Sequence, residues 1–484
     1  MEMTLPFVNL GTIMPQIIVA FFAMAALMVD AFYRNTRYVF AVSILGLALA
    51  LYAVYMQCGL VIPPEESMVA INSYTVFFNV IFLLVAAVTM FLSLSYADLT
   101  GIDGGKYYPL ILLATLGMML LISSRDMLLM FLAIELLSIS SYILVASQRD
   151  RWMSNEAAIK YMLTGAFASA FLLFGIALVF GATGTMDFMK IKQALSDGPV
   201  LFHAQIGLAM MLVGLGFKVA MVPFHMWAPD VYEGAPTPIS GFLSAGSKVA
   251  VFAFLLRLFA DPFAVPHADW IAVLWWISVL SMVVGNVSAL LQKSVKRMLA
   301  YSSIAHVGYM LMALVILDTR AMEAAVLYMA VYAITGLAAF GCVACLSKGP
   351  EERLDIQDYT ALAYSHPVQA GVLSVCLLSL AGIPLTAGFI GKFYLFGAAV
   401  NAGFVGLAVI GVLNSAVSLY YYMGLMLKMY TAPEGVGEIA VTSPMAGRLV
   451  LIVLGLAILI LGIYPSPVLG FVKVAVAAIA SPVM

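Results

Sequence analysis

Seven ionisable side chains interrupt apolar stretches of the sequence, where charged or titratable groups are rare. They are Glu135, Lys160, Lys218, Lys248, Lys392, His225 and His306. Each of these residue types binds and releases a proton, and burial or a neighbouring charge strongly changes how readily it does so. A series of such groups inside an apolar protein predicts proton transfer from one buried site to the next.

Three of the lysines lie well inside their apolar stretches. Lys248 is about half-way along one, and Lys218 and Lys392 each follow a pair of glycines. A charge in the bilayer core costs at least about 2.5–3.5 kcal/mol on insertion scales. A hydrated, functional interior is therefore favoured over purely structural ion pairing. Lys160 is about one turn inside its stretch, and snorkelling to the surface is an equal alternative for it.

Glu135 is the acid expected to act on Lys218. A nearby carboxylate would hold the lysine charged, and its loss would favour the neutral amine, because desolvation disfavours the charged form. A lysine that changes charge with a movable neighbour stores and releases a proton. The spacing in the sequence does not itself place Glu135 and Lys218 in contact.

The two histidines extend this set. His225 lies in the segment PFHMWAPD and His306 in SSIAHVGY. A relay role is favoured for both, because histidine titrates near neutrality; the alternative is a histidine whose hydrogen bonds are merely satisfied. The neighbouring hydroxyl groups could hold ordered water or simply pack helices together. They belong to Ser138, Ser140, Ser141, Ser302, Ser303 and Tyr309.

The composition requires a lipid environment for these groups. The chain has 484 residues, of which 64% are hydrophobic and 10% charged, whereas a soluble domain has about 25% charged residues. A net charge of −2 gives no indication of a nucleic-acid partner. Each span must be a helix, since lipid offers the backbone no hydrogen bonds. At about 20 residues a span, the sequence predicts an all-α integral membrane protein of about fourteen transmembrane helices.

The apolar stretches define the expected spans. They are 12–32, 38–58, 73–96, 108–123, 127–147, 155–181, 203–226, 238–260, 269–291, 296–316, 321–347, 366–399, 403–430 and 446–473. Spans seven and twelve carry glycine and proline at membrane depth, and paired breaks of this kind indicate a transport site between inverted repeats. Spans seven and twelve are five helices apart, and this odd offset would make the second copy inverted.

This offset divides the chain into four parts. They are three N-terminal transmembrane helices (1–105), a first inverted five-helix repeat of spans 4–8 (106–265), a second of spans 9–13 (266–432), and a C-terminal transmembrane helix (433–484).

The four cysteines give no sign of a metal or redox site. Cys342 and Cys345 form a C-x-x-C pair, but it lies in an apolar run with no second pair. We interpret them as small buried residues.

The basic residues predict an orientation. Twelve lie in odd-numbered loops, Lys296 and Arg151 among them, and six lie in even-numbered loops or the C-terminal tail, Arg257 among them. Cytoplasmic loops carry the excess of positive charge. Odd loops are therefore expected in the cytoplasm of a bacterial cell, and both termini on the periplasmic side of its plasma (inner) membrane.

Four stretches carry a family resemblance. They are FLAIELLSISSY (131–142), FKVAMVPFHMWAPDVYEGAPTP (217–238), QKSVKRMLAYSSIAHVGY (292–309) and AGIPLTAGFIGKFY (381–394). With these motifs the chain resembles the antiporter-like subunits of NADH:quinone oxidoreductase, respiratory complex I. The segment PDVYEGAPTP and Lys392 are most similar to the subunit N type.

The resemblance implies roles for individual residues. Glu135 and Lys218 would form a switchable pair, Lys248 the central relay, and Lys392 the connection to the far side. It also implies that His225 and His306 lie in the hydrated axis, and that Lys160 is a secondary basic residue near the pair.

The resemblance further implies that no cofactor is held by this chain alone. FMN, iron–sulfur clusters and quinone are expected in partner subunits, where the redox chemistry takes place. The expected partners are other complex I membrane subunits, especially neighbouring antiporter-like and small ones, within the lipid bilayer.

Two other functions fit the residues. A subunit of a multi-subunit Na⁺/H⁺ antiporter would share the fold and the buried lysines. A structural membrane scaffold that has lost pumping would share the fold alone.

Overall fold

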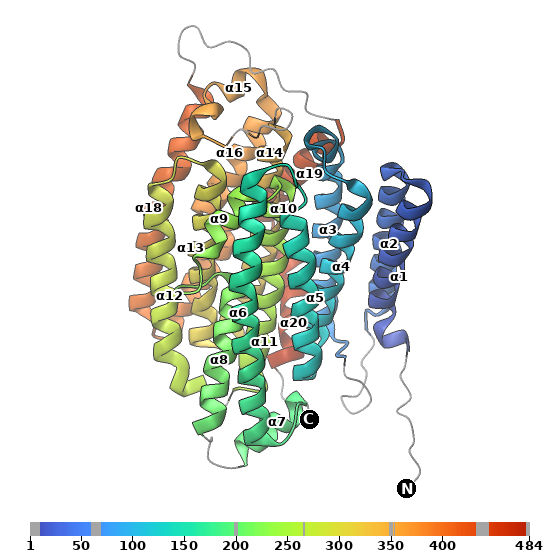
Figure 1. Cartoon of the computed structure of the whole chain (residues 1–484). Helices are drawn as coiled ribbons and strands as arrows, with labels where there is room; N and C mark the ends of the chain where they lie inside the picture. Colours follow the sequence, from blue (N-terminus) through green and yellow to red (C-terminus); the bar gives the residue numbers. More distant parts are fainter. Residues whose placement is uncertain are drawn as a thin grey trace.

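The computed structural model describes residues 10–59, 69–197, 202–264, 267–347, 352, 354–431 and 445–480. Within these ranges the chain is helical apart from turns, bends and three isolated β-bridges. Thirteen of the helices there are long and apolar enough to cross a membrane. They run side by side as one bundle (Figure 1), which confirms the all-α membrane fold.

The chain begins with helices that flank the bundle. A short 3₁₀ turn, Leu10–Ile13, leads into α1 (Met14–Tyr33), which returns as α2 (Thr36–Met56). The pair stands at one side in Figure 1 and packs against α3 (Ser73–Thr100) and α4 (Gly104–Ser123).

The next helices include the first predicted break. They are α5 (Met127–Val145), α6 (Trp152–Thr183), the short α7 (Phe188–Ser196), α8 (Phe202–Val219), α9 (Trp227–Gly234), α10 (Thr237–Phe242), a π-helical turn (Leu243–Ser247) and α11 (Lys248–Ala260). Asp103, Asp126 and Asp187 cap α4, α5 and α7, because each carboxylate accepts hydrogen bonds from free backbone N–H groups at a helix start.

The last part of the chain contains the second predicted break. Its helices are α12 (His267–Leu290), α13 (Val295–Ile316), α14 (Thr319–Cys345), a 3₁₀ turn (Ile356–Tyr359), α15 (Leu362–Ser365), α16 (Pro367–Ala381), α17 (Ala387–Asn401), α18 (Val405–Tyr430), α19 (Met445–Ile463) and α20 (Ser466–Ala480). Lys348 and Arg353, which the sequence assigns to the loop after α14, lie outside the described residues.

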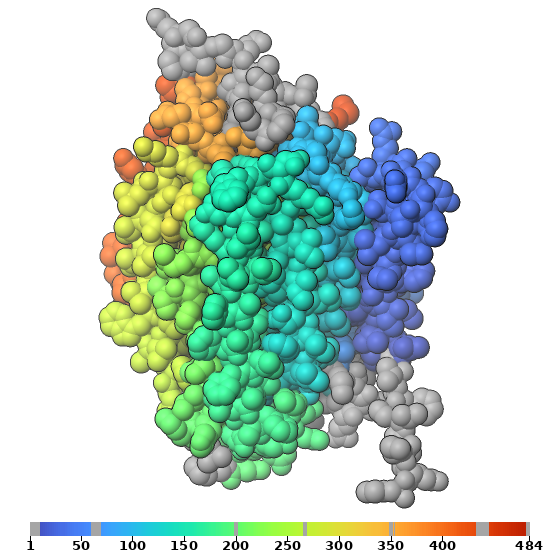
Figure 2. Space-filling view, in the orientation of Figure 1, coloured from blue at the N-terminus to red at the C-terminus, as the bar shows by residue number. Residues whose placement is uncertain are grey.

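Three spans form the interior of the bundle. Every residue in the most apolar stretch of the span 237–260 is buried, and so are 89% of that stretch in α13 and 94% in α14. The corresponding stretches of α6 and α18 are only 33% buried. Figure 2 shows one outer face, to which α5, α6 and α12 contribute. These helices carry exposed apolar side chains such as Leu132, Phe167 and Trp276. Lipid or partner subunits must cover such a face.

Two breaks occur where glycine and proline predict them. Span seven is interrupted between Val219 and Trp227, and span twelve between Ala381 and Ala387. Two further interruptions are not predicted: the π turn before Lys248, and the bend between α19 and α20. The stretch predicted as a single C-terminal helix therefore consists of two helices in sequence. Gly462 at this bend lies against the backbone of Thr386, so the last span abuts the break in span twelve.

The first and last described helices have their outer ends at the same end of the bundle. If α16 and α17 count as one broken span beside the thirteen long helices, the described part of the chain contains fourteen candidate spans. An even number of crossings returns the chain to its starting side. Figure 1 agrees, because α1 begins and α20 ends at the lower end of the bundle, where α7 also lies, while α15 lies at the opposite end.

Candidate functional site

Lys218 is buried near the end of α8, directly before the first break. Its side chain is only 2% exposed, and within the described chain its Nζ has no hydrogen-bond partner. Instead the Nζ atom lies 4.9 Å from the ring centres of both Tyr142 and Tyr161. Aromatic faces attract a cation, but they accept its protons far less well than oxygen does. The charge on Lys218 is therefore poorly stabilised by its immediate contacts.

Glu135 stands on α5, the helix that also carries Tyr142. Its carboxylate accepts a hydrogen bond from Ser169 of α6, and it acts electrostatically on both Lys218 and Tyr142. No ion pair joins Glu135 to Lys218 in the part of the chain that the structure describes. The two groups thus attract each other without direct contact, and a movement of either one would change the charge balance of Lys218.

Lys248 is the first residue of α11, directly after the π turn. Such turns are rare and frequently occur at functional sites. Its Nζ atom, on a side chain that is 3% exposed, donates to Oγ of Ser303 on α13 at 2.5 Å and lies 5.0 Å from the ring centre of Tyr232. One turn earlier, Ser244 shares a hydrogen bond of 2.6 Å with Tyr332 of α14. Hydroxyl groups from three helices therefore surround Lys248.

His306 lies within electrostatic range of both the central lysine and the last one. It lies in the middle of α13, with Nδ1 2.6 Å from the hydroxyl of Tyr328 and Nε2 3.2 Å from that of Tyr422. The Tyr422 hydroxyl also bonds to Ser302, the residue next to the partner of Lys248. Both Lys248 and Lys392 act electrostatically on the imidazole. Ser302, Tyr422, His306 and Tyr328 therefore form one hydrogen-bonded group that lies beside Ser303, the partner of Lys248. Such a group has the chemistry that a proton relay needs.

Lys392 lies on α17, just beyond the second break. Its Nζ donates to the backbone oxygens of Leu380 at 2.8 Å and Ala381 at 3.1 Å, and to Oγ of Ser415 at 2.8 Å. These two carbonyl groups have no hydrogen-bond partner within the helix because α16 ends at Ala381. Gly382 closes that helix at φ +84°, and a Cβ there would lie 2.9 Å from Cδ of Lys392, so glycine is required.

The remaining two predicted residues have different surroundings: Lys248 acts electrostatically on His225, whereas Lys160 lies at the surface. His225 lies in the break between α8 and α9, 8% exposed, and its Nδ1 has no hydrogen-bond partner within the described chain. Lys160 has a side chain that is 45% exposed, and it forms ion pairs with Glu156 at 2.9 Å and Asp230 at 2.7 Å. Asp230 is also bound by Arg297 at 2.7 Å. Lys160 thus belongs to a charged network at the surface.

A buried charge cluster, which the sequence did not reveal, joins distant parts of the chain. The Glu352 side chain is fully buried and forms ion pairs with Arg151 at 2.5 Å and Lys296 at 3.1 Å. Tyr96 and Thr237 donate hydrogen bonds to the same carboxylate. Burial alone would raise the pKa of Glu352, but the charges of Lys296 and Arg151 and these hydrogen bonds outweigh it and lower this pKa to about 2.

This cluster corrects the sequence assignment of the basic residues. Lys296 was assigned to a loop, yet it is the second residue of α13, its side chain is fully buried, and its Nζ donates to the backbone oxygen of Ala235 at 2.6 Å. Arg257, also assigned to a loop, belongs to α11 and donates to the backbone oxygen of Ile122 at 2.7 Å. Hydropathy misses both, because each lies at the end of an apolar stretch and its partner is far away in the sequence.

The chain resembles known membrane subunits over nearly its whole length. Residues 124–418 match the family model described as NADH:quinone oxidoreductase/Mrp antiporter, transmembrane. The chain belongs to this family. NADH-quinone oxidoreductase subunit N of Trichlorobacter lovleyi is 42% identical over 97% of each chain, and that of Geotalea uraniireducens is 41% identical over 96% of this chain and 98% of the relative.

Solved structures support the family membership. A chain of respiratory complex I from Thermus thermophilus aligns with a TM-score of 0.80 and 36% identity, covering 94% of this family member and 98% of that chain. A chain of the Mrp complex from Dietzia aligns with a TM-score of 0.87 over 98% of both chains, but at 20% identity this likeness concerns the fold alone. The resemblance predicted from the four motifs is confirmed, including its subunit N type.

Proposed function

We propose that this family member is the proton-translocating subunit N of a bacterial NADH:quinone oxidoreductase, with protons moving along the row Glu135–Lys218, Lys248, His306 and Lys392. The observation that carries the proposal is the group of polar side chains between Lys248 and Lys392. Lys248 donates to Ser303, and the adjacent Ser302 is hydrogen-bonded through Tyr422 to His306, on which both lysines act electrostatically. Buried ionisable groups in a membrane protein mark ion pathways.

The proposed mechanism begins at the first pair. When Glu135 approaches Lys218, the attraction favours the charged lysine. Within the described chain the Lys218 Nζ has no hydrogen-bond partner. When the carboxylate moves away, the neutral amine is therefore favoured and the proton is released. Lys248 receives charge next, and Lys392 holds it at the second break, where three oxygen atoms stabilise it. Redox chemistry with FMN, iron–sulfur clusters and quinone would take place in partner subunits.

We assign secondary roles to His225 and Lys160 in this proposal. His225 lies in the first break, where its free Nδ1 is available to a water molecule. Lys160 sits with Asp230 and Arg297 in the surface network, where it would supply protons to the buried row.

The repeat organisation and the orientation are part of the same proposal. Spans 4–8 (106–265) and 9–13 (266–432) would be inverted repeats, each contributing one broken helix, after the N-terminal helices (1–105) and before the C-terminal part (433–484). The end of the bundle that carries α15 would face the cytoplasm, with both termini in the periplasm, as the excess of basic residues in odd loops indicates.

Replacement of Lys248 tests the proposal. In the assembled complex, Lys248→Met should strongly reduce proton pumping and coupled NADH:quinone activity, since no other ammonium group can occupy this position. The variant Lys248→Arg keeps a charge but cannot release a proton, so it should also be impaired if Lys248 passes protons and should be nearly normal if only its charge matters. Unchanged pumping by the Met variant would refute the row and favour a structural scaffold.

The composition of the purified complex tests the alternative function. Partner subunits with flavin and iron–sulfur clusters support a quinone-reducing complex. Purification with antiporter subunits alone, together with sodium-dependent proton exchange, would instead favour a Na⁺/H⁺ antiporter.

A further inference from the structure

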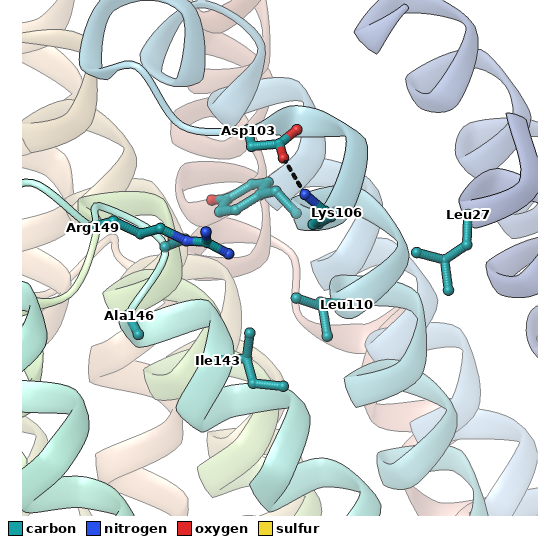
Figure 3. A pocket seen from close by; sticks show the side chains of 9 residues that line it. Leu27, Asp103, Lys106, Leu110, Ile143, Ala146 and Arg149 are labelled. Atoms are coloured by element: carbon teal, nitrogen blue, oxygen red, sulfur yellow. Dashed lines mark hydrogen bonds and ion pairs between the residues drawn. The ribbon is translucent and has the colours of Figure 1, made fainter. Parts of the chain in front are cut away.

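An open cavity lies beside α4, where the N-terminal helix α1 and the helix α5 leave a gap. It has a volume of about 350 Å³ and lies among α1, α4 and α5. Both α1 and α5 pack against α4, and the space between them remains open, with Leu27 of α1 facing Leu110 of α4 across it (Figure 3). Cavities of this size accommodate a small molecule or part of a larger one.

The walls of the cavity are apolar. Leu27, Leu110 and Ile143 line its membrane side. The hydroxyl groups nearby are already engaged, because Ser147 donates to the backbone of Leu144 at 2.7 Å and Tyr107 shares a hydrogen bond of 2.9 Å with Ser93. Apolar cavities do not hold water stably. Hydrocarbon is the material that fits such walls in a membrane.

The rim of the cavity is basic. Lys106 and Arg149 line its upper end, and the guanidinium of Arg149 points toward Lys106 and Asp103 in Figure 3. Lys106 forms one exposed ion pair, with Asp103 at 2.8 Å, and the Arg149 side chain has no hydrogen bond or ion pair within the described residues. Two cations and one carboxylate leave one positive charge and several free N–H donors.

We propose that this cavity binds one membrane phospholipid with an anionic headgroup. Its acyl chain would lie against Leu27, Leu110 and Ile143, and its phosphate would accept hydrogen bonds from Arg149 and Lys106. Three observations support this occupant: an apolar crevice of sufficient size, a basic rim at one end of the helices, and free donors on that rim. Basic pockets between transmembrane helices on the cytoplasmic side are suited to anionic lipid headgroups.

A lipid bound here would fasten α1 and α2 to the bundle. It would fill the gap between α1 and α5 and contribute dispersion contacts that two separated helices cannot make.

A photoreactive amino acid at Ile143 tests the proposal in the intact complex. The complex is placed in vesicles of phosphatidylglycerol and phosphatidylcholine in equal amounts and irradiated, and adducts on this chain are identified by mass spectrometry. The expected product carries phosphatidylglycerol at least fivefold more often than phosphatidylcholine. The double variant Lys106→Gln/Arg149→Gln should abolish that preference.

Two controls make each outcome decisive. The same photoreactive residue at Phe21, on the exposed face of α1, reports labelling that does not depend on the cavity. The double variant Arg37→Gln/Arg448→Gln removes two exposed charges that do not line the cavity and should leave the preference at position 143 intact. Adducts with another subunit, equal labelling by both lipids, or no lipid adduct at position 143 would each overturn the proposal.

Discussion

The lysines at the two broken helices have opposite surroundings. Lys218 lies against two tyrosine rings and has no hydrogen-bond partner within the described chain. Lys392 donates to two backbone oxygens and to Ser415. Since a buried ammonium needs oxygen acceptors to remain charged, the charge of Lys392 is supported by its own fold, and that of Lys218 depends on Glu135. In the proposed mechanism, one break therefore forms a switch, and the other a proton acceptor with a supported charge.

The surroundings of both lysines depend on how the helices pack against one another. Glu352 contributes to this packing, because it links Arg151 and Thr237 of the first half of the chain to Lys296 of the second. Glu352→Gln leaves Lys296 buried without its carboxylate, and breaking a buried ion pair costs about 3–5 kcal/mol. We expect a clear drop in thermal stability of the complex. The control Glu156→Gln removes an exposed ion pair, worth about 0–1 kcal/mol. Equal stability of the two variants would show that the cluster does not hold the halves together.

The same cluster predicts a pH dependence. The pKa of Glu352 is lowered to about 2 in the folded protein from the ordinary glutamate value of 4.5. A lowered pKa means that its stabilising contribution is complete above the unfolded value and is lost as the pH falls toward 2. Unfolding of the wild type and of Glu352→Gln should therefore differ most near neutrality and converge in acid. A constant difference down to pH 2 would contradict the ionised cluster.

The next largest effect concerns the two lysines themselves. Lys218→Met and Lys392→Met should each reduce proton pumping by about a hundredfold, the scale of a lost proton-transfer group. The variants should differ in rescue. Arginine remains charged, so neither arginine variant can pass on a proton. Lys392→Arg should still recover the part of the activity that needs only a positive charge at the second break, whereas Lys218→Arg, fixed in the charged state of the switch, should recover none. Equal recovery at both positions would remove the distinction between switch and acceptor.

Glu135 tests the dependence of Lys218 on an external charge. Glu135→Gln keeps the hydrogen bond with Ser169 possible but removes the charge, and we expect about tenfold less pumping, equivalent to about one pKa unit. Glu135→Asp retains the charge and should be much milder. If both variants are equally impaired, the carboxylate serves packing. Pumping is measured with a pH-sensitive dye in reconstituted vesicles.

The residue types in the sequence were sufficient to find the lysines but not their surroundings. Lys218, Lys248 and Lys392 stand out because lipid does not tolerate a charge, and proline and glycine revealed both breaks. The contacts that distinguish Lys218 from Lys392 come from other helices, such as Ser415 on α18. No local pattern encodes such contacts, because they depend on how helices pack.

The same reasoning explains what the sequence missed. Glu352 and Lys296 are 56 residues apart and pair only because α13 and the segment after α14 meet at one end of the bundle. The π turn before Lys248 has no sequence signal that we recognise. The bend before α20 contains Pro465, a breaker that lay within the predicted last span.

The smallest predicted effect is also the sharpest test of the comparison. Ser415→Ala removes one of three acceptors from Lys392. Because the oxygens of Leu380 and Ala381 remain, we expect only about a threefold loss of pumping. The matched variant Ser169→Ala removes the hydrogen bond that holds the Glu135 carboxylate. Lys218 depends on the charge of this carboxylate, because its Nζ has no hydrogen-bond partner within the described chain. It should therefore reduce pumping more than Ser415→Ala does, and the reverse order would show that Lys218 is not the more sensitive of the two sites.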